Sequence, residues 1–181
     1  MAVGPDDLVL RYSWREGSIP PPDHYEYVIT VSARLGASAP PYASRATAAL
    51  GTAAQCESAE GTIEFLPDYP EHEPPVWRER FQVSPRQMAD LFALMEKTGL
   101  FDREWADSGE PCVGGSLEWL SVDAGGRRIT VPSTPQDAGA IEPLYACIRE
   151  LAPLEIWKRL SVRHEEFRLS YGRPKRQEDA K

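Results

Sequence analysis

The start of a helix at Ser84 is the feature that most constrains how this chain can fold. Ser84 can cap the free amide of Gln87, Gln87 can reach back to the amide of Ser84, and Pro85 suits the first helical position. The apolar residues that follow recur at helical spacing: Met88, Leu91, Phe92 and Met95. Gly99 can then adopt the left-handed conformation that ends a helix. The sequence therefore predicts a helix over 85–98 whose one apolar face packs against another layer.

Strand patterns lie on both sides of this helix. The clearest covers 24–32, where Tyr25, Tyr27, Ile29 and Val31 alternate with smaller or polar residues. Further strands are expected over 8–14, 61–66, 76–83, 117–123 and 127–131. A second main helix is expected from about 142 to 151 and a short third one over 154–160.

Pairs of strands that short turns can join alternate with single helices along the chain. That order predicts an α+β fold with two layers, in which a mainly antiparallel sheet of about four to six strands carries two main helices on one face. The patterns do not fix the order of the strands in the sheet. One domain is expected over 1–170, in which 33–58, rich in Ala, Ser, Thr, Gly and Pro, forms a long flexible loop or insertion. A disordered tail is expected over 171–181.

Charge and composition narrow the classes of partner. The 28 acidic and 20 basic residues give a net charge of −8, which disfavours nucleic acid as a partner. No apolar run approaches the roughly 18 residues that span a bilayer, so no membrane partner is expected. Three cysteines, an odd number, favour reduced thiols and a cytoplasmic location. The excess of arginine over lysine, together with abundant alanine, points to a bacterial genome of high GC content.

About two thirds of the chain, from Tyr25 to Leu151, resembles a loose group of uncharacterised bacterial domains. The matching segments are Tyr25–Thr30, Gly61–Phe65, Val83–Met88, Gly99–Phe101 and Gly125–Arg127. All of them are strand, cap or turn signals. The resemblance implies the same α+β layout and brings with it no catalytic residue.

Few residues suggest a catalytic, metal-binding or cofactor-binding site. Cys112 stands beside glycines that would let backbone amides approach an oxyanion, which makes it a weak candidate nucleophile. Glu71, His72 and Glu73 crowd into one turn and are weak candidate metal ligands, although their spacing matches neither a calcium loop nor a zinc motif. No glycine-rich loop has the lysine that phosphate binding requires, and no cofactor is expected.

The first hypothesis for function is a non-catalytic module that binds a protein partner or associates with itself, for example as a homodimer. A sheet with helices on one side leaves its other face free for such a contact. The candidate contact residues are Trp105, in an otherwise charged loop, and Trp14 and Tyr25 on the predicted strands. The alternative is a small-molecule binding protein or hydrolase with its pocket under the 33–58 loop. Whether the protein is an enzyme stays open, with a non-catalytic role preferred.

Overall fold

The computed structural model describes residues 7–35, 56–110 and 114–171. The strands are β1 (Asp7–Arg15), β2 (Glu26–Leu35), β3 (Cys56–Leu66), β4 (Trp77–Gln82), β5 (Leu117–Ala124) and β6 (Arg127–Val131). The helices are the short 3-10 helix η2 (Pro70–His72), α2 (Pro85–Lys97), α3 (Ala138–Leu151) and α4 (Leu154–Ser170). The candidate nucleophile Cys112 and, apart from Tyr171, the predicted tail lie outside the described residues.

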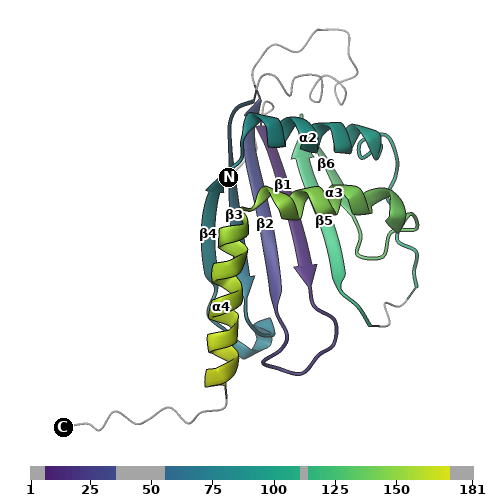
Figure 1. Cartoon of the computed structure of the whole chain (residues 1–181). Coiled ribbons are helices and arrows are strands. Elements are labelled where there is room, and N and C mark those ends of the chain that lie inside the picture. The colour runs from purple at the N-terminus through teal and green to yellow at the C-terminus, as the bar shows by residue number, and fades with distance from the viewer. Residues whose placement is uncertain (1–6, 36–55, 111–113, 172–181) are drawn as a thin grey trace, which may run out of the picture.

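The described strands form one antiparallel sheet in the order β4-β3-β2-β1-β5-β6. The α-helices α2, α3 and α4 all lie against one face of it, so the fold is the predicted two-layer α+β architecture (Figure 1). Helices α2 and α3 cross the strands, whereas α4 runs along them over β3 and β4 (Figure 1). The opposite face of the sheet, called the open face below, carries none of the described α-helices.

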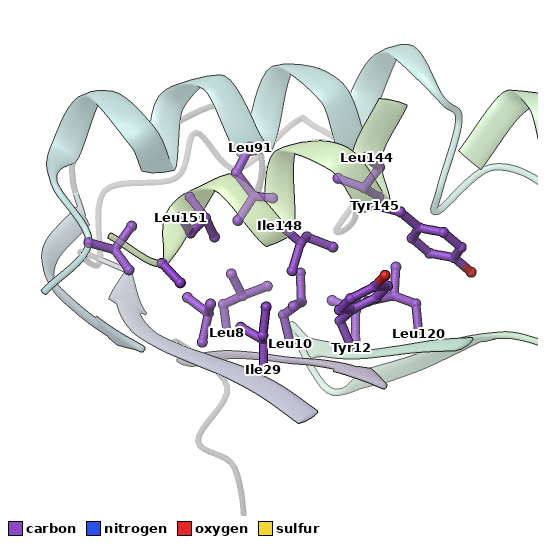
Figure 2. Close-up of a cluster of buried hydrophobic side chains, with 14 of the residues drawn as sticks. Leu8, Leu10, Tyr12, Ile29, Leu91, Leu120, Leu144, Tyr145, Ile148 and Leu151 are labelled. Atoms are coloured by element: carbon purple, nitrogen blue, oxygen red, sulfur yellow. The ribbon is translucent and has the colours of Figure 1, made fainter. Parts of the chain in front are cut away.

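The core lies between the sheet and the crossing helices. Alternate residues of the central strands, Leu10 and Ile29 among them, point toward Leu91 of α2 and Ile148 of α3 (Figure 2). All four side chains are inaccessible to solvent. Burying a side chain of this size contributes roughly 1.5–3 kcal/mol, so this contact holds the two layers together.

The helix expected over 85–98 is confirmed, with the capping box that its sequence predicts. The Ser84 hydroxyl accepts a hydrogen bond from the Gln87 amide at 3.3 Å, and the Gln87 side chain accepts one from the Ser84 amide at 3.0 Å. Its apolar stripe is buried, as helical spacing requires.

Four element boundaries differ from the sequence prediction. Strand β3 begins at Cys56, inside the loop expected over 33–58, and β2 extends to Leu35, so the loop's two ends pair with each other. Helix α3 begins at Ala138 rather than near 142, because it accommodates Pro143 within its length. Helix α4 continues to Ser170 rather than 160, because contacts with the sheet order its polar second half.

Candidate functional site

A hollow of about 450 Å³ opens between α4 and the helix-covered face of the sheet. Its aromatic lining comes from both sides, with Tyr25, Tyr27 and Phe65 on the sheet and Trp157 and His164 on α4. The remaining lining residues are Arg149, Leu154, Leu160, Ser161 and Glu165. This volume lies in the range of about 300–1,000 Å³ that is usual for ligand sites. We call this feature the aromatic hollow.

The sheet wall of the aromatic hollow follows from strand register. One row of directly opposed residues crosses five strands: Trp77, Phe65, Tyr27, Trp14 and Glu118. Tyr25, two residues before Tyr27, inserts its ring between Phe65 and Trp14, with centroid separations of 5.3 and 4.8 Å. Cross-strand aromatic pairs of this kind stabilise a sheet. The result is a nearly continuous aromatic wall that ends at a carboxylate.

The α4 wall stands over these rings. Trp157 meets Tyr27 edge-on at 5.0 Å, and His164 lies 5.3 Å from Tyr25 and 5.8 Å from Phe65. Because residues seven apart share one helix face, both α4 side chains point toward the sheet. The indole nitrogen of Trp157 donates to the carbonyl of Arg149 at 3.3 Å, which ties α4 to the end of α3.

The polar end of the aromatic hollow is a network around Arg149. Its Nη1 donates to Oε2 of Glu118 at 2.7 Å and to the hydroxyl of Tyr12 at 2.8 Å. The Tyr12 hydroxyl itself donates to Glu118 at 2.6 Å, and Nη2 of Arg149 donates to Glu142 at 3.1 Å. Hydrogen bonds that involve a charged group are the strong ones in proteins. Hydrogen bonds to three side chains therefore fix the position of Arg149 in the lining of the aromatic hollow.

Burial sets the protonation of this network. It raises the pKa of Tyr12, Tyr27 and Tyr145 well above the usual value, so all three phenols stay protonated. Burial opposes the charge of Arg149, but the Tyr12 hydrogen bond and the Glu118 carboxylate raise its pKa overall. Arg149 thus supplies a fixed positive charge, and the neutral phenols do not ionise to act as bases.

His164 makes the stability of the site depend on pH. Its pKa is lowered, mainly because burial penalises the charged ring, although the carbonyl of Pro22, 3.1 Å from Nε2, opposes the shift. The unfolded chain therefore takes up this proton first, so the stabilisation is complete above about pH 6.5 and is lost as the pH falls through the lower folded pKa. We expect the free energy of unfolding, measured with urea, to fall less between about pH 7 and pH 5 in His164→Gln than in the wild type. Equal slopes would contradict this.

The structure brings two of the three predicted contact residues together. Trp14 and Tyr25 are in ring contact beside the aromatic hollow, but on the helix-covered side of the sheet rather than on its open face. Trp105 is not an exposed loop residue. It is 9% exposed and belongs to the core, its indole nitrogen donates to the carbonyl of Leu100, and Arg103 lies over its ring. Trp105 therefore packs into the core although its sequence neighbours are mostly charged.

The candidate metal ligands do not converge. His72 pairs through Nδ1 with Asp68 at 3.0 Å, while Glu71 is exposed and Glu73 ends the η2 helix. Within the described residues, no three His, Cys, Asp or Glu side chains are grouped as metal ligands. None of the described helices is long and apolar enough to cross a membrane.

Sequence reasoning missed the Arg149 network. The available signal was Glu118, a carboxylate at a position of β5 that shares its face with Leu120 and Val122. A charged residue on the buried face of a strand requires a partner.

No protein-family model matches the chain, and no curated protein is similar to it.

Proposed function

We propose that this protein is a non-catalytic binding module and that the aromatic hollow receives an aromatic ring of its ligand. The observation that carries the proposal is the pair of facing aromatic walls, from the sheet and from α4, with a guanidinium at one end. Rings pack favourably against other rings, edge-on or offset, and a polar group on the ligand can reach Arg149. The odd number of cysteines and the arginine-rich composition favour a bacterial cytoplasm as its location.

A protein is the expected source of this ring, either a partner or a second copy of the chain. Tryptophan and tyrosine are the residues that most often anchor protein interfaces in pockets. A small aromatic molecule is the alternative, which the volume of the aromatic hollow favours. Both sources share the same chemistry, so one experiment can test the site and then separate them.

The arrangement of groups favours binding over catalysis. Ser161 and His164 are the lining residues that could form a nucleophile and base, but His164 is 3.1 Å from the carbonyl of Pro22 and no hydrogen bond joins it to Ser161. The Glu118 carboxylate is already engaged, because its Oε2 accepts hydrogen bonds from both Tyr12 and Arg149.

Ser161→Trp tests the site by filling it. Ser161 is exposed and lines the aromatic hollow, so a large side chain there obstructs the cavity without disturbing the core. We expect indole to bind the wild type with a Kd on the order of 1 mM, by amide chemical-shift titration, and to bind at least tenfold more weakly to Ser161→Trp. Ser170→Trp, at the exposed end of the same helix, is the matched control and should bind like the wild type.

The same titration separates the sources of the ring. A short peptide with a central tryptophan should bind more tightly than indole if a protein presents the ring, and no more tightly if the natural ligand is a small molecule. Sedimentation equilibrium of the wild type and Ser161→Trp shows whether a second copy is the occupant. No binding of indole to the wild type, or equal binding to Ser161→Trp, would overturn the proposal.

A further inference from the structure

One row of side chains on the open face contains only arginine and hydroxyl residues. The pairing registers align one residue from each described strand, in the order Arg80, Thr62, Thr30, Arg11, Ser121 and Thr130. Their chain neighbours, such as Leu10 and Ile29, point into the core, so the row lies on the open face. We call it the arginine–hydroxyl row. It presents hydrogen-bond donors across the full width of the sheet and no carboxylate.

The open face carries arginine side chains that are not ion-paired, although the chain as a whole is acidic. Its carboxylates are largely engaged: Glu64 pairs with Arg78, Asp123 with Arg128 and Glu26 with Arg15, at 2.7–2.8 Å. Glu60 accepts a hydrogen bond from Gln82. Arg11 and Arg80 are exposed, and among the described side chains neither forms an ion pair. The guanidinium groups of Arg11 and Arg80, both in the arginine–hydroxyl row, are thus available to a ligand.

From this complementarity we propose that the open face binds an extended acidic segment of a protein partner, lying across the strands along the arginine–hydroxyl row. Guanidinium groups bind carboxylates with two parallel hydrogen bonds, and the hydroxyls can donate to backbone carbonyls. Arg80 and Arg11 lie three strands apart, about 14 Å, which matches two acidic residues about four positions apart in an extended chain. Trp119, half-buried on the same face, supplies an apolar contact beside the row.

Other occupants fit less well. A second copy stacked on the same face would bring arginines against arginines, because the row has no carboxylate to receive them. A nucleic acid is wide enough to cover a neighbouring row as well, where Glu60, hydrogen-bonded to the uncharged Gln82, repels phosphates. A protein segment can instead position its carboxylates only where the arginines stand. The proposal is independent of the aromatic hollow, which lies on the other face of the sheet.

The experiment measures fluorescence anisotropy of a labelled peptide in which glutamate recurs at every fourth position among threonine and valine. We expect Arg11→Thr with Arg80→Thr to bind it at least tenfold more weakly than the wild type, because threonine keeps the strand propensity and removes both guanidinium groups. The matched control is Arg78→Thr with Arg128→Thr, which removes the same charge from the same face but only from ion-paired arginines. It should change the affinity less than threefold.

Three results would overturn this inference. One is the absence of peptide binding to the wild type at about 1 mM peptide. The second is equal weakening in the two double variants, which would mean that net charge alone attracts the peptide. The third is tighter binding of a single-stranded oligonucleotide of equal charge. Melting temperatures of both double variants verify that each is folded, and Ser161→Trp, which alters only the aromatic hollow, should bind the peptide normally.

Discussion

Arg149→Met is expected to lower the free energy of unfolding by about 2 kcal/mol. Arg149 is the common partner of Tyr12, Glu118 and Glu142, and only 18% of the Glu118 side chain is exposed. Without the guanidinium, the Glu118 carboxylate keeps Tyr12 as its partner but has no compensating charge. Methionine preserves much of the side-chain volume, so the loss reports the network rather than a cavity. Urea unfolding at neutral pH measures it.

A double-mutant cycle separates the Arg149–Glu118 interaction from other effects of the substitution. We expect Arg149→Met combined with Glu118→Gln to be less destabilised than the sum of the single changes, because the second removes the charge that the first leaves unpaired. Arg159→Met is the control. Its ion pair with Glu79 joins α4 to β4, but Arg159 is 55% exposed, so its loss should cost less than about 1 kcal/mol. Equal costs at Arg149 and Arg159, or simple additivity in the cycle, would contradict the role given to Arg149.

The two-layer fold could be predicted because its signals are local. Ser84, Pro85 and Gln87 encode a helix start within four residues, and the alternation at Tyr25–Val31 encodes a strand and the side of it that is buried. The length of helix α4 was underestimated because the contacts that order its second half come from residues distant in the sequence. After Leu160 its sequence is mostly charged, and what orders it is contact with distant rings: Phe167 with Trp77 and His164 with Phe65.

The site could not be predicted because it depends on strand order. The aromatic wall on the sheet exists only because β1, β2, β3 and β4 are neighbours in register. The arginine–hydroxyl row also requires that β5 pair with β1, although about 100 residues separate these two strands in the chain. Alternation shows that Trp14 shares a face with Tyr12, but not which residue lies opposite. Likewise, Glu118 and Arg149 come from different layers. Nothing local to either residue identifies the other.

Leu160→Ala is expected to release α4 while the rest of the fold persists. Leu160 is completely buried and also lines the aromatic hollow, so its truncation should cost about 3 kcal/mol through lost burial and the cavity left behind. Helix α4 is attached along a single side, whose buried residues are Ile156 and Leu160, whereas the central core lies under α2 and α3. The substitution therefore weakens mainly the packing of α4 against the edge of the sheet.

Hydrogen exchange followed by mass spectrometry distinguishes local release from general destabilisation. In Leu160→Ala, amides of α4 should exchange at least tenfold faster than in the wild type, while those of β1 and β2 keep most of their protection, and indole binding should disappear with the α4 wall. Val162→Ala, at an exposed position of the same helix, should change stability by less than about 0.5 kcal/mol and leave both readouts unchanged. Uniform loss of protection across α4 and the sheet would show that the helix unfolds only with the whole domain. In that case the aromatic hollow would be as rigid as the core, and a ligand could enter it only through its open mouth rather than by displacement of α4.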